Sequence, residues 1–134
     1  EMNIRDWSSD VCSSDLNMTL STYVPDILSS ELYSFLNPIF EKYNITQDDV
    51  QLWGIHPGGR AILDKVERTL GLGSDALQAS RHVLSGYGNM SSATILFVLK
   101  ELLEANAGAP DQKALAMAFG PGLTIESALL TKQS

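Results

Sequence analysis

Residues 50–70 read VQLWGIHPGGRAILDKVERTL, and their hydrophobic pattern changes within a few positions. The first part, Val50 to Ile55, is a short and nearly continuous apolar run, which indicates a buried β-strand. The loop HPGG at 56–59 follows. Beyond it, apolar residues recur at helical spacing until Gly71, which predicts an amphipathic helix that ends at this glycine. A strand followed by a Gly-rich loop and a helix is typical of α/β proteins.

On the N-terminal side of this stretch, a long amphipathic helix is predicted to begin near Pro25. Thr46 and Asp49 form a cap-like turn between this helix and the strand. The helix is expected to bury one face. That face comprises the apolar positions Ile27, Leu28, Leu32, Phe35, Leu36, Ile39, Phe40 and Tyr43.

On the C-terminal side, Ser74 and Asp75 are expected to cap a further helix that runs toward Leu84. The residues at 86–89 interrupt the helical pattern. Ser91 or Ser92 is then expected to cap a strongly apolar helix, largely buried, that continues through Leu103.

Two strand-like segments close the chain after a polar Gly/Pro linker at 106–112. They are Ala114 to Phe119 and Thr124 to Leu130, and the short loop between them favours a hairpin. The order of elements predicts an α/β fold with helices packed on a mixed β-sheet.

Composition excludes several classes of function. The chain has 134 residues, 44% of them hydrophobic, and a formal net charge of −7, which argues against a nucleic-acid partner. The longest apolar run, near Ala93 to Leu99, is much shorter than the roughly 20 residues of a membrane span. A single cysteine, Cys12, excludes an internal disulfide framework and a multi-thiolate metal site. We therefore expect a cytoplasmic protein with no membrane partner and no bound metal.

Residues 6–16, DWSSDVCSSDL, differ from the rest of the chain. They are polar and Ser-rich, they have no helical or strand periodicity, and they resemble a translated sequencing-adapter sequence. We therefore expect residues 1–16 to be a non-native or disordered leader and residues 17–134 to form the domain. A catalytic couple of Cys12 and His56 is disfavoured, because nothing around Cys12 can position or activate a thiolate.

Three Gly-marked loops are the candidate functional segments: HPGG at 56–59, YGN at 87–89 and FGPG at 119–122. Loops carry function more often than core segments do, although each of these also has an explanation as an ordinary turn. The sequence contains no phosphate-binding P-loop, no complete GxGxxG, no GxSxG and no HExxH. His82, in a predicted surface helix, is interpreted as structural.

Three segments resemble the C-terminal region of type III polyketide synthases, the chalcone and stilbene synthase family. They are WGIHPGGRAILDKVE at 53–67, SRHVLSGYGNMSSATILFVL at 80–99 and AFGPGLTIESALL at 118–130, in the family's order and with its His-to-Asn separation. The resemblance implies a thiolase-like α/β fold, a homodimer, and a Cys-His-Asn catalytic set that acts on coenzyme A thioesters without a further cofactor.

By this resemblance His56 matches the catalytic histidine and Asn89 the catalytic asparagine. The family's cysteine belongs to an N-terminal half that the sequence does not contain. Ala118 replaces the first glycine of the family's Gly-Phe-Gly-Pro-Gly loop, which puts cavity volume and product length in doubt. The positions matched to substrate and coenzyme A binding are Gly58, Gly59, Ala61, Ser91, Phe119, Gly120, Pro121 and Gly122.

The family reaction is the decarboxylative condensation of malonyl-CoA with an acyl-CoA starter, so the resemblance implies an acyltransferase that is inactive as the isolated chain. One alternative is a β-ketoacyl-carrier-protein synthase III-like enzyme, although HPGG and the GPG loop do not fit its usual pattern. Another is a non-catalytic dimerisation or binding module. Without an N-terminal half to pack against, we expect apolar surface near Leu36 and Leu96 to be partly uncovered in the isolated chain.

Overall fold

The computed structural model of the chain describes residues 24–105, 111–120 and 124–131, and for residues 24–30 it describes the backbone alone. The expected leader at 1–16, Cys12, Pro121 and Gly122 lie outside the described residues. The elements in chain order are α2 (Val24–Tyr43), the 3₁₀ turn η1 (Gln47–Asp49), β1 (Leu52–Ile55), α3 (Arg60–Leu70), α4 (Gln78–Tyr87), the 3₁₀ turn η2 (Ser91–Ala93), α5 (Thr94–Ala105), β2 (Lys113–Gly120) and β3 (Thr124–Thr131).

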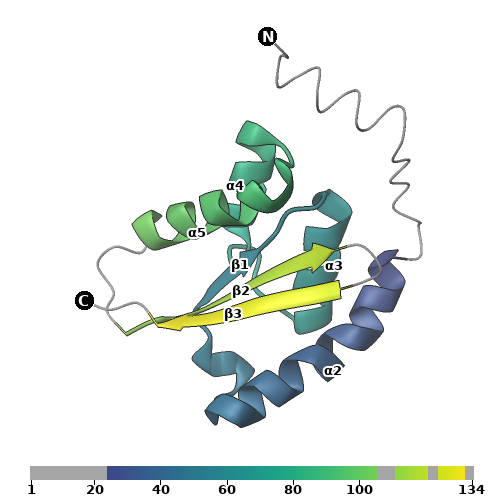
Figure 1. The fold of residues 1–134 in the computed structure, drawn as a ribbon, viewed down its shortest axis with the longest axis vertical. Helices are drawn as coiled ribbons and strands as arrows, with labels where there is room; N and C mark the ends of the chain where they lie inside the picture. Colours follow the sequence, from purple (N-terminus) through teal and green to yellow (C-terminus); the bar gives the residue numbers. More distant parts are fainter. Residues whose placement is uncertain (1–23, 106–110, 121–123, 132–134) are drawn as a thin grey trace.

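The strands form one mixed sheet in the order β1-β2-β3 (Figure 1). β1 is parallel to β2, and β3 is antiparallel to β2, as the hairpin pattern predicted. Helices α2 and α3 lie on one side of the sheet and helices α4 and α5 on the other. The predicted α/β fold, with helices on a mixed sheet, is confirmed.

The larger hydrophobic core lies on the α2–α3 side. Alternate residues of the strands point into it, because successive side chains of a strand face opposite sides of the sheet. Trp53 and Ile55 of β1 and Leu115 and Met117 of β2 are all buried there. The helices contribute Leu32, Leu36, Ile62, Leu63, Val66 and Leu70.

On the opposite face of the sheet, small residues in the middle of β1 and in β2 let α5 approach closely. A side-chain carbon added at Gly54 would lie 3.4 Å from Cδ2 of Leu99, and Ala114 and Ala116 occupy the neighbouring strand positions. The smaller core cluster on this side consists of Leu52, Leu102 and Ala114. The alternation of small and large residues in β2 therefore determines which helix pair packs on each face.

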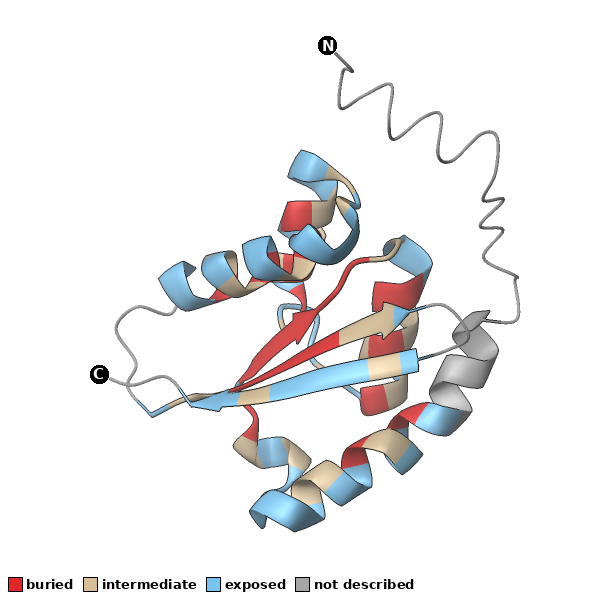
Figure 2. Ribbon diagram, viewed as in Figure 1, coloured by how far each residue is buried: buried red, intermediate tan, exposed pale blue. Residues whose placement is uncertain are grey.

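The two edges of the sheet differ in their cover. β1 is buried along its length, whereas β3 is mostly exposed (Figure 2). The outward backbone N–H of Ile55 donates to Oγ of Ser80 at 3.1 Å, and Ser80 is fully buried in α4. A side chain of α4 thus provides a hydrogen-bond acceptor for the backbone N–H at the edge of β1 just before His56.

Several local predictions are confirmed. The Asp49 carboxylate accepts hydrogen bonds from the Thr46 backbone N–H at 2.7 Å and from its hydroxyl at 2.9 Å, which makes the cap-like turn. Gly71 ends α3 in the left-handed conformation, with φ of 62°. Glycine adopts this conformation at little cost, which explains why the helix stops there.

Other local predictions are wrong. Helix α4 begins at Gln78 after a turn and has no side-chain cap from Ser74 or Asp75. Neither Ser91 nor Ser92 caps α5, because both lie within η2. In α2, Tyr43 is 52% exposed although the helical pattern placed it on the buried face. It is the last residue of the helix, beyond the part that the sheet and α3 can cover.

The prediction that α5 is largely buried is also wrong. Thr94, Val98 and Leu102 are buried, but Leu96 is 65% exposed and Phe97 is 41% exposed. Apolar surface was expected to be uncovered near both Leu36 and Leu96. It is exposed at Leu96, whereas Leu36 is fully buried within the described residues. Among the described residues, no helix has the length and apolar character needed to cross a bilayer.

Candidate functional site

His56 lies directly after β1 and extends the pairing of the sheet. Its backbone N–H donates to the carbonyl oxygen of Met117 at 2.7 Å. Because the carboxyl ends of parallel strands meet at the same edge of a sheet, the HPGG loop after β1 and the end of β2 at Phe119 and Gly120 share one edge. Parallel α/β sheets bind ligands at this edge.

The His56 side chain is buried and polar, and it is 8% exposed. Its Nδ1 atom is buried without a hydrogen-bond partner among the described residues. Burial lowers the pKa of the imidazole, because desolvation disfavours the charged form. A neutral ring with an unsatisfied nitrogen is therefore held at the edge of the sheet, and unsatisfied buried polar atoms are uncommon enough to need a specific explanation.

Asn89 comes from a separate loop, after α4. Gly88 ends that helix with φ of 73°, and its N–H donates to the Leu84 carbonyl oxygen at 3.0 Å. The Asn89 side-chain amide then donates from Nδ2 to the carbonyl oxygen of Gly58 at 3.4 Å. The structure therefore brings the predicted asparagine next to the loop that carries the predicted histidine, although 31 residues separate Asn89 from Gly58.

The hydrogen bonds of Asn89 fix which way its amide points. The backbone N–H of Ser91 donates to Oδ1 of Asn89 at 2.9 Å. A backbone N–H can only donate, so the oxygen must lie on the Ser91 side and the NH₂ group on the Gly58 side. One hydrogen of Nδ2 serves the contact with Gly58, and Nδ2 carries a second hydrogen on a residue that is itself exposed.

The other predicted binding residues divide between the same edge and the core. Gly58 and Gly59 are half-buried at the start of α3, and Ala61 and Ser91 are exposed. The Phe119 side chain packs against the larger core, on the α2–α3 side of the sheet. Gly120 is exposed at the end of β2.

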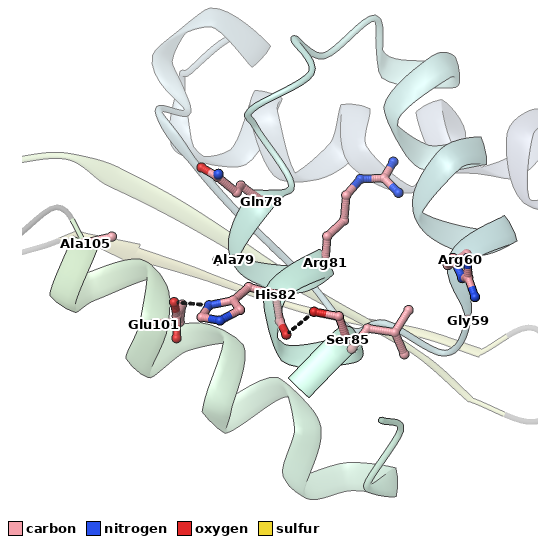
Figure 3. A pocket seen from close by; sticks show the side chains of 10 residues that line it. Gly59, Arg60, Gln78, Ala79, Arg81, His82, Ser85, Glu101 and Ala105 are labelled. Atoms are coloured by element: carbon pink, nitrogen blue, oxygen red, sulfur yellow. Dashed lines mark hydrogen bonds and ion pairs between the residues drawn. The ribbon is translucent and has the colours of Figure 1, made fainter. Parts of the chain in front are cut away.

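A groove lies between α4 and α5 and reaches the start of α3 (Figure 3). In it, Nδ1 of His82 lies 2.5 Å from Oε1 of Glu101, so the pair links α4 to α5. Arg81 points the other way and makes ion pairs with Asp64 at 2.7 Å and Glu67 at 2.9 Å. His56 and Asn89 do not line this groove, whose residues are Gly59, Arg60, Gln78, Ala79, Arg81, His82, Leu84, Ser85, Glu101 and Ala105.

Thr94 is a residue of the site region that the sequence interpretation missed. It is the first residue of α5, it is fully buried, and its hydroxyl makes hydrogen bonds within the loop that follows Asn89. A polar residue at the start of an apolar helix was the available signal.

The arrangement is suited to binding an anionic oxygen. Imidazole and carboxamide groups are both N–H donors, and here they come from adjoining loops at the open edge of a sheet. Preset donors of this kind stabilise negative charge that develops during a reaction. Within the described residues, no cluster of three or more His, Cys, Asp or Glu side chains is arranged to hold a metal ion.

Comparisons with known proteins agree with the fold. A family profile described as "Chalcone and stilbene synthases, C-terminal domain" matches residues 7–133. The crystal structure of PKS-I from the brown alga Ectocarpus siliculosus is similar, with a TM-score of 0.80 and 33% sequence identity over 85% of this chain. The match covers 32% of that protein, so the chain spans about a third of its relative's length. The predicted thiolase-like fold class is confirmed, and the chain belongs to the family of chalcone and stilbene synthase C-terminal domains.

Proposed function

We propose that this domain supplies two catalytic groups, His56 and Asn89, to a type III polyketide synthase that condenses malonyl-CoA with an acyl-CoA starter. The observation that carries the proposal is the contact between Asn89 Nδ2 and the carbonyl oxygen of Gly58, because it joins the asparagine loop to the histidine loop. The position of His56 directly after β1, where its backbone N–H pairs with Met117, supports it.

The chemistry needs two donors at one oxygen. When the malonyl thioester loses carbon dioxide, the electron pair of the broken C–C bond delocalises onto the thioester oxygen and makes it negative. N–H groups of His56 and Asn89 would stabilise this enolate more strongly than the neutral ground state. The resulting carbanion equivalent attacks the carbonyl carbon of the enzyme-bound acyl group, and the thiolate of the cysteine leaves.

The nucleophilic cysteine of the proposed reaction would come from chain that this sequence does not contain. A thiolate beside His56 would favour the protonated ring, whereas burial favours the neutral ring. The two effects oppose one another, so the charge of His56 in the complete enzyme depends on which is larger. The thiolate in turn is stabilised by a cationic imidazole.

The alternatives receive less support. The family profile and the PKS-I relative favour a type III synthase over a β-ketoacyl-carrier-protein synthase III-like enzyme. The net charge of −7 also does not favour docking of an acidic carrier protein. A non-catalytic binding module would not require the His56 and Asn89 loops to meet, and the assay below distinguishes it.

The remaining parts of the proposal follow from family membership. They are coenzyme A thioesters as substrates without a further cofactor, a homodimer, and a cytoplasmic location. We also propose that Gly58, Gly59 and Ala61 line the path of the pantetheine arm, since a backbone with small or missing side chains lets a ligand approach closely. The positions proposed to line the polyketide cavity are Ser91, Phe119, Gly120, Pro121 and Gly122.

The test uses the longer polypeptide that carries this domain together with a cysteine-bearing segment. Carbon dioxide release from malonyl-CoA is measured for the wild type, His56→Ala and Asn89→Ala. Each substitution is expected to lower kcat by about 10²–10³, the usual cost of losing one such donor.

Matched controls come from the same domain. His82→Ala removes a histidine outside the proposed site, and Asn37→Ala removes an exposed asparagine of α2. Both controls should keep near wild-type rates. A longer polypeptide that releases no carbon dioxide, or one in which His56→Ala and Asn89→Ala match the controls, would contradict the proposed function.

A further inference from the structure

Thr94 makes a small hydrogen-bond network at the start of α5. Its Oγ1 accepts a hydrogen bond from the backbone N–H of Met90 at 2.8 Å. The same hydroxyl donates to the carbonyl oxygen of Ser91 at 2.8 Å. Thr94 is fully buried, so water does not compete for these bonds. The hydroxyl thereby ties Met90 and Ser91, the first two residues after Asn89, to the first turn of the helix.

The segment held by Thr94 has an unfavourable backbone conformation. Ser91 has φ of 60°, in the left-handed region that residues other than glycine rarely adopt. Such a conformation persists when the surrounding contacts enforce it. Here the bonds of the Thr94 hydroxyl hold the residue before Ser91 and the carbonyl of Ser91 itself.

The conformation of Ser91 matters because it aims a backbone N–H at Asn89. That N–H donates to Oδ1 of Asn89 at 2.9 Å, which places the NH₂ group toward Gly58. The Thr94 Oγ1 atom also lies 3.5 Å from Oδ1 of Asn89. The orientation of the asparagine amide therefore depends on the hydroxyl of Thr94, three positions beyond Ser91, the loop residue that contacts the amide.

We infer that Thr94 is a positioning residue, which fixes the direction in which Asn89 presents its N–H to a substrate oxygen. The inference rests on the proposed function of Asn89. Without the Thr94 hydroxyl, Ser91 is free to relax to a common backbone conformation, and the Asn89 amide loses the bond that fixes its rotation. Misdirection of a donor lowers catalysis even though the donor itself is still present.

The test compares Thr94→Val, which keeps the shape of the side chain and removes the hydroxyl, with Thr94→Ser, which keeps the hydroxyl. Both are assayed for malonyl-CoA decarboxylation in the longer polypeptide. Thr94→Val should lower kcat by about 10-fold to 100-fold with KM changed by less than about 2-fold, since the donor acts mainly in the transition state. Thr94→Ser should restore kcat to near the wild-type value.

A second arm separates positioning from a general structural effect. In an Asn89→Ala background there is no amide to direct, so adding Thr94→Val should cause no further loss of kcat. A purely structural role predicts that the two losses multiply. Thermal unfolding checks that each variant folds, and Thr94→Ala, which has no bulk to accommodate, replaces Thr94→Val if that variant is unfolded.

The outcomes are distinguishable. An inactive wild type speaks against the proposed function. Two results with an active wild type overturn the positioning role of Thr94: Thr94→Val is as active as the wild type, or the losses in kcat multiply in the double variant. Both results leave the proposed function of Asn89 intact.

Discussion

At the residue scale, the environment of His56 combines burial with an unsatisfied nitrogen. A buried imidazole resists protonation because the charged form loses its hydration. The backbone of His56 is held by Met117, so the ring is placed by the sheet rather than by a side-chain partner. The ring thus has a defined position at the end of β1, and its buried Nδ1 has no hydrogen-bond partner among the described residues.

The lowered pKa of His56 makes a prediction about stability. Because burial holds the pKa of His56 in the folded chain below its ordinary value of 6.5, the unfolded chain binds the proton more readily. The contribution of His56 to the free energy of unfolding should therefore be constant above pH 6.5 and fall as the pH drops below it, with a slope of at most about 1.4 kcal/mol per pH unit. Urea unfolding of the wild type and of His56→Gln between about pH 7 and about pH 5 tests this.

Carboxylates also begin to titrate in that range, so the informative quantity is the difference between the two proteins. His82→Gln is the matched control, since this histidine is largely exposed. Equal pH dependence in the wild type and His56→Gln would show that the ring at position 56 takes up a proton as easily in the folded chain as in the unfolded one.

At the element scale, the sequence predicts what hydrophobic periodicity encodes and fails where tertiary contacts decide. The β1, HPGG and α3 sequence was predictable because apolar runs, glycines and helical spacing act locally. The exposure of Leu96 was not predictable. An apolar side chain on a helix favours a buried position, but the sequence does not show whether another segment covers it. The His56 and Asn89 pair was predictable through the family motif, whereas their juxtaposition depends on a contact between distant loops.

Helix α5 packs against β1 because Gly54 has no side chain. In Gly54→Val the first added carbon would already contact Cδ2 of Leu99 at 3.4 Å, so the two further methyl groups require the Leu99 side chain to shift. We expect a loss of about 1–3 kcal/mol in the free energy of unfolding, typical of overpacking. Gly73→Val is the control, since nothing lies within 4 Å of a carbon added there. Urea denaturation of dilute protein measures both, and equal losses would refute close packing at Gly54.

The hydrogen bond between the Ile55 N–H of β1 and the Ser80 hydroxyl of α4 can be tested directly. Ser80→Ala leaves the buried N–H of Ile55 without its acceptor, which typically costs about 1–3 kcal/mol of stability. Ser85→Ala, in the same helix, removes an exposed hydroxyl and should change stability by less than about 0.5 kcal/mol. Hydrogen exchange gives a local readout, because the Ile55 amide should exchange faster in Ser80→Ala. An unchanged exchange rate would mean that α4 does not protect this edge through Ser80.

At the scale of the whole molecule, the apolar surface is concentrated on the exposed side of α5. Leu96 is 65% exposed, Phe97 is 41% exposed, and the Phe97 ring lies 5.5 Å from that of Tyr87, which is itself 63% exposed. On the sheet, Leu130 of β3 pairs with Ala114 and so stands on the same side as α5. The chain spans about a third of its relative's length, and we expect a longer chain to cover this surface.

The isolated chain should therefore associate through α5, because burying exposed apolar surface lowers the free energy. Salt screens the repulsion between chains of net charge −7 beyond about 10 Å. Sedimentation velocity over a range of concentrations should show self-association of the wild type and a monomer for the double variant Leu96→Glu, Phe97→Glu. The control, Asn37→Glu with Tyr43→Glu, adds the same charge to exposed positions of α2 and should still associate.

If both double variants become monomeric, net charge alone governs association, and if neither does, the contact lies on another surface. A wild type that stays monomeric at every concentration and unfolds cooperatively would show that the exposed side of α5 needs no partner.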